Sequence, residues 1–200
     1  MARRDRPDHY ADRAKKEGYR ARSVYKLEEI DRKSRIFENA AHVLDVGAAP
    51  GSWTQYAARH IKPGGRVVAV DLKPVDLPPR EELLLLQGDV TAEDIRARLR
   101  QEGPFDLVLS DAAPATAGNR TVDAARSADL AWTVVALAEE LLAPGGNLVV
   151  KLFQGGEERE LLGALRSRFE KARSQRPRAT RGDSFEVYLV GLGYRAENAP

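Results

Sequence analysis

One lysine lies inside a run of residues that otherwise predicts a buried strand. Lys151 is flanked by Val149, Val150, Leu152 and Phe153 in the stretch VVKLFQGG. Burying an ammonium group costs free energy unless the group is paired or becomes neutral. The ordinary alternative is a lysine that extends to solvent from the end of a strand. The position therefore indicates either a partner for the ammonium or a lysine that takes part in chemistry.

Acidic residues stand where three other apolar runs stop. Asp71, Asp89 and Asp111 occur in VDLKP, QGDV and SDAAP. In a doubly wound sheet, ligands bind at the carboxyl ends of the strands, near the point where the strand order reverses. One aspartate at a strand end is equally often the cap of the next helix. Several charged residues at a single edge, with Lys151 among them, indicate a site.

The turn after the first predicted strand has two glycines. Its sequence, DVGAAPGSW, carries Gly47 and Gly51 with Pro50 between them. A dinucleotide-binding turn requires a third glycine so that a helix can point at the pyrophosphate, and a phosphate-binding loop requires a lysine. A G-x-x-x-G turn lets the backbone approach a bulky ligand without phosphates. This pattern favours S-adenosylmethionine over NAD.

Asp71 and Asp89 suit the adenosyl part of such a cofactor. A carboxylate at the end of the second strand can accept hydrogen bonds from both ribose hydroxyls, and one at the end of the third can accept from the adenine amino group. The pattern therefore predicts a methyltransferase that uses an adenosyl cofactor.

Strand and helix patterns alternate along most of the chain. Apolar runs typical of strands occupy residues 42–47, 66–71, 82–89, 104–111, 147–153 and 184–194. Helical patterns occupy residues 23–33, 52–61, 91–103, 123–143 and 157–169. Thr91 is expected to be an N-cap. Runs such as VVAV and LVLS are apolar on both faces, so the alternation predicts an α/β protein with a doubly wound, mostly parallel sheet.

The composition excludes several kinds of site. The chain has 200 residues, of which 42% are hydrophobic and 31% charged, as in an ordinary globular protein. It has no cysteine and three scattered histidines, so we expect no disulfide, no thiol nucleophile and no metal site. No apolar run approaches the roughly 20 residues that span a bilayer, and the N-terminus does not resemble a secretory signal. We expect a cytoplasmic protein without a membrane partner.

The net charge of +2 hides an uneven distribution. Residues 1–22 carry eight Lys/Arg and four Asp/Glu, and residues 166–181 carry seven Lys/Arg and one acidic residue. These ranges are called the two basic segments below. Clustered cations release counterions from a phosphate backbone, which favours a nucleic-acid partner over two merely solvated surfaces.

Seven motifs together resemble one family. ARSVYKLEEI, DVGAAPGSWTQY, VDLKP, QGDV, SDAAP, VVKLFQG and EVYLV resemble the FtsJ/RrmJ (RlmE) family, the 2′-O-ribose methyltransferases of large-subunit ribosomal RNA. The resemblance runs from about Ser23 to Gly193. It implies a class I S-adenosylmethionine-dependent methyltransferase fold, which is Rossmann-like, with a seven-stranded sheet and an antiparallel last strand. We expect a basic N-terminal segment, 1–22, and a single methyltransferase domain, 23–200.

The resemblance also implies roles for individual residues. The family carries a Lys-Asp-Lys-Glu tetrad, which maps to Lys26, Asp111, Lys151 and Glu186. Lys151 would either take the proton from a ribose 2′-hydroxyl or stay charged and stabilise the alkoxide that forms. Asp111 would orient it and face the methyl group, while Lys26 and Glu186 position the ribose. The implied cofactor-binding residues are Gly47, Gly51, Trp53, Asp71, Asp89 and Asp111.

The sequence thus predicts an RNA 2′-O-methyltransferase with S-adenosyl-L-methionine as cofactor. The expected substrate is a uridine of 23S ribosomal RNA, naked or in the assembled large ribosomal subunit, and the enzyme is expected to be a monomer. The alternatives are the same chemistry on tRNA, an mRNA cap or another RNA, and a non-catalytic RNA-binding protein. The last would require a broken tetrad. A small-molecule methyltransferase would leave the two basic segments unexplained.

Overall fold

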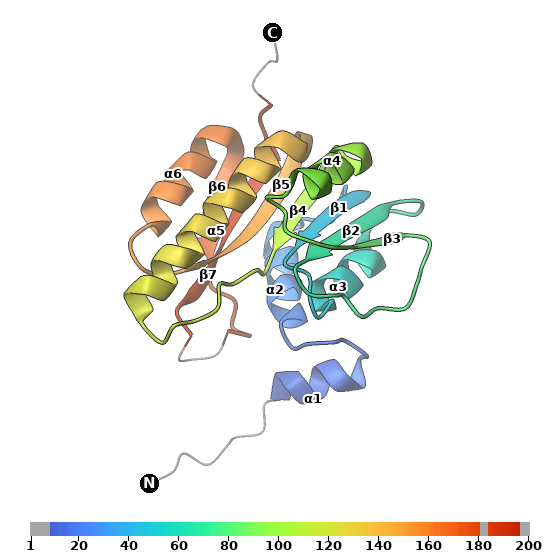
Figure 1. Ribbon diagram of the computed structural model, residues 1–200, viewed down its shortest axis with the longest axis horizontal. Coiled ribbons are helices and arrows are strands. Elements are labelled where there is room, and N and C mark those ends of the chain that lie inside the picture. Colours follow the sequence, from blue (N-terminus) through green and yellow to red (C-terminus); the bar gives the residue numbers. More distant parts are fainter. Residues whose placement is uncertain (1–8, 181–183, 197–200) are drawn as a thin grey trace.

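The fold is built on one seven-stranded sheet with helices packed against it (Figure 1). The computed structural model describes residues 9–180 and 184–196. The strands are β1 (His42–Val46), β2 (Arg66–Asp71), β3 (Leu83–Gln87), β4 (Phe105–Ser110), β5 (Leu142–Phe153), β6 (Phe169–Gln175) and β7 (Glu186–Tyr194). The helices are α1 (His9–Lys16), α2 (Val24–Ser34), α3 (Ser52–His60), α4 (Glu93–Glu102), α5 (Arg120–Leu141) and α6 (Glu158–Arg168).

The strand order is β3-β2-β1-β4-β5-β7-β6, and it reverses between β1 and β4. Strands β1 to β5 pair in parallel, while β7 is antiparallel to both β5 and β6. This arrangement confirms the predicted α/β class and the antiparallel last strand. Because the order reverses beside β1, the turn after β1 opens at the position where ligands bind in doubly wound sheets.

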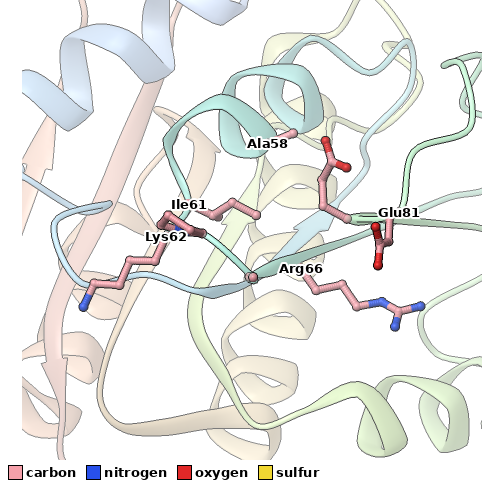
Figure 2. Close-up of a pocket in the computed structure, with 9 residues that line it drawn as sticks. Ala58, Ile61, Lys62, Arg66 and Glu81 are labelled. Atoms are coloured by element: carbon pink, nitrogen blue, oxygen red, sulfur yellow. The ribbon is translucent and has the colours of Figure 1, made fainter.

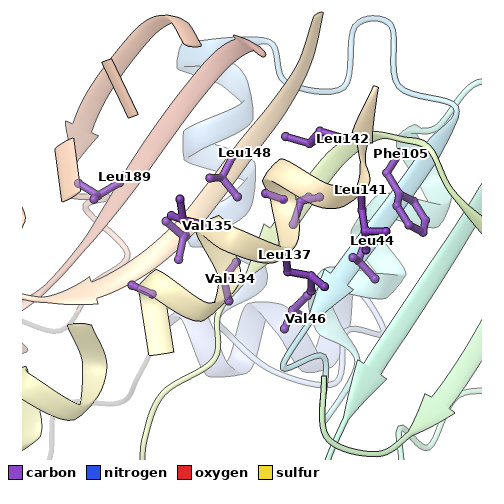
Figure 3. Packing of buried hydrophobic residues seen from close by; sticks show 14 of the residues in the cluster. Leu44, Val46, Phe105, Val134, Val135, Leu137, Leu141, Leu142, Leu148 and Leu189 are labelled. Carbon is purple, nitrogen blue, oxygen red and sulfur yellow. The ribbon is translucent and has the colours of Figure 1, made fainter. Parts of the chain in front are cut away.

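Helices cover both faces of the sheet, which explains why its central strands are apolar on both sides. Figure 1 shows α4, α5 and α6 on one face and α2 and α3 on the other. Side chains of β1 divide accordingly, because Leu44 and Val46 pack with α5 whereas Val43 packs with α2 and α3. Figure 3 shows the first of these cores, where Val134, Leu137 and Leu141 of α5 meet the sheet. Helices therefore cover both faces of the sheet, and a ligand has access to the ends of its central strands.

Several predicted boundaries were wrong for identifiable reasons. Thr91 is not an N-cap, since Ala92 precedes α4 and Thr91 instead donates to Asp89. Helix α5 begins earlier than predicted, at Arg120, because the Asn119 side chain accepts from the next backbone amides. Strand β5 begins at Leu142, inside the helix predicted for residues 123–143 and ahead of the predicted strand 147–153.

Two elements were not located from the sequence. Strand β6 has the sequence FEKARSQ and is the seventh strand that the family resemblance implied but the apolar pattern did not locate. It lies at the edge of the sheet, where charged side chains reach solvent. Helix α1 packs against α2 through the rings of Tyr10 and Tyr25, whose centroids are 5.5 Å apart. Residues 1–8 of the first basic segment lie outside the described residues.

Within the described ranges 9–180 and 184–196, no helix has the length and apolar character needed to cross a membrane.

Candidate active site

The ammonium of Lys151 is paired with the residue that follows β4. Its Nζ donates to Oδ1 of Asp111 at 2.9 Å and to the backbone oxygen of Asp111 at 2.5 Å. The two residues meet because β4 and β5 are neighbouring parallel strands that end at the same edge. Lys151 is only 8% exposed. The pairing satisfies the energetic requirement that its position in an apolar strand creates.

A second ion pair lies beside the first. Lys26, on α2, contacts the carboxylate of Glu186 at the start of β7. The antiparallel register places Tyr188 opposite Lys151 and Phe153 opposite Glu186. The structure therefore brings together the four residues to which the tetrad was mapped, from α2, β5, β7 and the loop that follows β4.

Tyr188 connects the two ion pairs and was not predicted. Its hydroxyl donates to Oδ1 of Asp111 at 2.7 Å, and the Nζ of Lys26 lies 5.9 Å from its ring centroid. Burial raises the pKa of Tyr188 well above its ordinary value, and the charge of Asp111 acts in the same direction. The hydroxyl therefore stays a neutral donor. The sequence EVYLV contained the signal for Tyr188: it lies two residues after Glu186, and residues two apart in a strand share a face.

The two glycines of the β1–α3 turn allow the backbone to approach its neighbours closely. Gly47 has a φ of +74°, and a Cβ on it would lie 2.5 Å from the Cβ of Ala112, just after β4. Gly51 has a φ of +106°, and a Cβ there would lie 2.9 Å from Cγ of Leu77. Any other residue would be strained and would fill the space between the turn and the adjacent loops.

Asp71 is fixed against that same turn. Its Oδ2 accepts from the amide of Ala49 at 3.0 Å, and its Oδ1 accepts from the amide of Lys73 at 2.8 Å. Each carboxylate oxygen can accept a further hydrogen bond. The aspartate therefore retains acceptor capacity at the end of β2.

Asp89 lies just beyond β3, whose Gln87 pairs with Asp71. Its Oδ1 accepts from both the amide and the hydroxyl of Thr91, each at 2.8 Å. The bond from the Thr91 amide, followed by that from its hydroxyl, lowers the pKa of Asp89 below its usual value. Asp71 and Asp89 thus present exposed or half-buried acceptors at adjacent strand ends, as the predicted adenosyl group would require.

The indole of Trp53 is buried in the core. It is 2% exposed, and its Nε1 donates to the backbone oxygen of Ser23 at 2.9 Å, which ties α3 to the residue before α2. Its ring also lies 5.7 Å from that of Tyr188. Trp53 therefore supports the tyrosine behind the tetrad, and its backbone lies in the first turn of α3, beside Gly51.

A buried carboxyl group beneath the turn was also missed. Asp45 of β1 is fully buried, and its Oδ2 accepts from the Thr54 hydroxyl at 2.7 Å. Its Oδ1 has no hydrogen-bond partner among the described residues. Burial, together with the charges of Asp111 and Asp71, raises the pKa of Asp45 to about 7. Its place in the motif DVGAAPG was the available signal.

The two basic segments, far apart in sequence, meet on α2. Arg22 donates through Nη2 to the backbone oxygen of Ala179 at 2.6 Å. Glu29 of α2 accepts from the amide of Arg178 at 2.5 Å, and Arg173 donates to the backbone oxygen of Lys33 at 2.8 Å. The helix that carries Lys26 is thus bordered by described parts of both segments.

A hollow of about 540 Å³ lies away from these residues. Figure 2 shows Ala58, Lys62, Arg66 and Glu81 around it, at the start of β2 and therefore at the opposite end of the sheet. It contains no residue of the tetrad or of the aspartate pair. We assign the site to the carboxyl edge, where ion pairs and acceptors converge. No cluster of potential metal ligands occurs in the part of the chain that the structure describes.

Comparison with known proteins gives one consistent result. An FtsJ-like methyltransferase family model matches residues 19–194. The ribosomal RNA large subunit methyltransferase E of Treponema denticola is 48% identical over 190 residues, which cover 94% of this chain and 96% of that protein. The protein of the same name from Sorangium cellulosum is 48% identical over 191 residues, which cover 96% and 90%.

Solved structures agree with this result. A Plasmodium falciparum protein assigned as a ribosomal RNA methyltransferase has a TM-score of 0.74 and 27% identity, and the match covers 88% of this chain and 98% of that chain. The O-methyltransferase TomG of Streptomyces achromogenes, solved with SAM, has a TM-score of 0.59 and 18% identity, with coverage of 96% and 92%. The second likeness concerns the fold alone.

Proposed function

Because the chain belongs to the FtsJ-like methyltransferase family, we propose that it methylates a ribose 2′-hydroxyl of large-subunit ribosomal RNA. The protein is an S-adenosylmethionine-dependent methyltransferase. The observation that carries the choice of a hydroxyl is the pairing of Lys151 with Asp111 beside the pair of Lys26 with Glu186. A base-carbon target would normally require a cysteine nucleophile, and the sequence has none.

The residues at the sheet edge fit the cofactor. The carboxylate of Asp71 would accept from its ribose hydroxyls, and that of Asp89 from its adenine amino group. Gly47, Gly51 and the backbone of Trp53 would border its methionine part, where the turn leaves no room for side chains. When bound, S-adenosylmethionine supplies an electrophilic methyl group on a sulfonium. Asp111 would lie beside this group.

The nitrogen of Lys151 has one hydrogen-bonding direction left for the substrate. Two directions are occupied by the hydrogen bonds to Asp111. The remaining one would face the 2′-oxygen, either as a lone pair that takes its proton or as an N–H that stabilises its developing charge. Lys26, held by Glu186, would hold the ribose in line for attack.

The described parts of both basic segments border the helix that carries Lys26, which supports a long RNA held through many phosphates. We propose residues 1–22 as an RNA-contacting segment and residues 23–200 as the catalytic domain of a cytoplasmic monomer. The specific substrate we propose is a uridine of 23S ribosomal RNA, either naked or in the assembled large subunit.

The decisive experiment determines where the methyl group is attached. The protein is incubated with radiolabelled cofactor and with large ribosomal subunits, or protein-free RNA from them, taken from cells that lack the enzyme. A 2′-O-methyl group blocks the oxygen that cleaves the next phosphodiester bond in alkali, so one labelled, alkali-resistant dinucleotide is expected. Label recovered on a base in ordinary mononucleotides would overturn the proposal.

A further inference from the structure

An aromatic pair stands at the solvent side of the two ion pairs. Phe153 ends β5, two residues after Lys151, and its partner in the antiparallel register is Glu186. Alternate residues of a strand share a face, and directly opposite residues of paired strands do too. The side chain of Phe153 therefore lies on the same face as Lys151, Glu186 and Tyr188, one step nearer the rim.

Phe185 and a cation complete the group. The ring centroids of Phe153 and Phe185 are 4.8 Å apart, with an angle of 53° between the planes. The guanidinium carbon of Arg120, the first residue of α5, lies 4.8 Å from the centroid of Phe185. Both phenylalanines are half-buried, and neither belongs to the two hydrophobic cores of the sheet. Core packing therefore does not account for them.

The backbone around this pair is held in place on both strands. The amide of Gln154 donates to the backbone oxygen of Phe185 at 2.8 Å, and the amide of Phe153 donates to the Ser127 hydroxyl at 3.0 Å. Arg176 of the second basic segment donates to the backbone oxygen of Ser184 at 2.5 Å and contacts the side chain of Gln154. The aromatic surface is thus fixed, and two arginines border it.

We propose that Phe153 and Phe185 form a stacking surface for a base of the RNA strand beside the methylated ribose. Arg120 and Arg176 would contact the phosphates of the same strand. Proteins that bind unpaired RNA combine an aromatic face for the base with cations for the backbone, and this rim of the site presents both. The proposal rests on the proposed function, because it takes the tetrad as the place where the ribose lies.

The first test uses Phe185→Leu, which keeps an apolar side chain but removes the aromatic face. Stacking of one base changes RNA affinity by about 5- to 150-fold. We expect the KM for RNA to rise within this range, with a small change in kcat and an unchanged Kd for S-adenosylhomocysteine. Tyr194→Leu is the matched control, because Tyr194 packs on Phe169 at the other end of β7. It should leave the KM for RNA unchanged.

The second test separates stacking from other causes. A synthetic RNA fragment spanning the mapped nucleotide is made with an abasic residue at that nucleotide or at either neighbour. At the position that stacks, the abasic RNA should bind wild type and Phe185→Leu equally, because the base and the ring form one interaction. The inference would be overturned if Phe185→Leu lost the same affinity for the intact RNA as for all three abasic RNAs. It would also be overturned if the variant lost no affinity for any of them.

A further variant covers the case in which Phe185→Leu does not fold. Arg120→Gln leaves both rings in place and should lower the slope of log Kd against log salt by about one. An unchanged slope would contradict the proposed phosphate contact. If the wild-type enzyme places no methyl group on ribose, the proposed function itself fails. If it does and no coupling to a base is found, only the stacking surface is refuted.

Discussion

Lys151 and Tyr188 lie opposite each other in neighbouring strands, and both donate to Oδ1 of Asp111. The carboxylate is therefore held from two directions, and the lysine is held with it. Because Tyr188 also packs on Trp53, this arrangement is anchored in the core. The edge of the sheet at which we propose that the RNA binds is thus supported from the core.

Tyr188→Phe removes the hydroxyl but retains the ring. We expect a loss of about 0.5–1.5 kcal/mol of stability, which is typical of one hydrogen bond, and a lower kcat because Asp111 and Lys151 are less well fixed. Binding of S-adenosylhomocysteine should change little. Tyr25→Phe is the matched control, since its hydroxyl also donates to a carboxylate, that of Glu17, away from the strand edge. Equal kcat values for the two variants would contradict the positioning role.

Lys151→Ala should reduce methyl transfer by about 10²–10⁴-fold or more, the range for loss of a general base or a charge stabiliser. Affinity for the cofactor should remain close to wild type. Lys151→Arg distinguishes the two roles, because arginine keeps the charge but does not release its proton. Substantial activity in this variant would refute proton abstraction by Lys151. Lys62→Ala, at the opposite end of the sheet, should have full activity and serves as the control.

Asp89→Ala should weaken cofactor binding by about 1–3 kcal/mol if a buried amino group loses its acceptor. Calorimetric titration with S-adenosylhomocysteine measures this change directly and requires no RNA. Asp94→Ala removes an exposed carboxylate from the first turn of α4 and should not affect the affinity. Unchanged affinity in a folded Asp89→Ala protein would remove this residue from the cofactor site.

Asp45 predicts a pH dependence of stability. Its pKa of about 7 in the folded protein lies above its ordinary value of 3.8. Folding thus favours the protonated form of Asp45. The stability that this proton contributes is fully present below the unfolded-state pKa of 3.8 and is lost as the pH rises to about 7.

Asp45→Asn has no carboxyl group at this position and should not lose stability in this way as the pH rises. The stability of the variant relative to wild type should therefore increase between about pH 4 and pH 7, by at most about 1.4 kcal/mol per pH unit, and be constant above. Urea unfolding of both proteins at pH 5, 6, 7 and 8 checks the prediction. Parallel pH profiles would show that the Asp45 carboxyl titrates normally in the folded protein.

The apolar pattern located six of the seven strands: five are inner strands of the sheet, and β3 is an edge strand with an apolar sequence, LLLLQ. It could not locate β6, whose sequence FEKARSQ is polar and which forms an edge. Nor could it pair Lys26 with Glu186, because the contact depends on how α2 crosses the sheet. The family resemblance placed these residues together before the geometry was known. Tyr188 was not identified as a site residue, because tyrosine is equally typical of an ordinary strand.

The position of β7 between β5 and β6 has a consequence for protein synthesis. Chains are made from the N-terminus, so the strand that occupies this inner place is the last of the seven to leave the ribosome. Until then, β5 has an unpaired edge, Lys26 lacks Glu186, and Asp111 lacks Tyr188. Closure of the sheet and assembly of the tetrad therefore occur together. A nascent chain that has not reached β7 therefore lacks both Glu186 and the hydroxyl that holds Asp111.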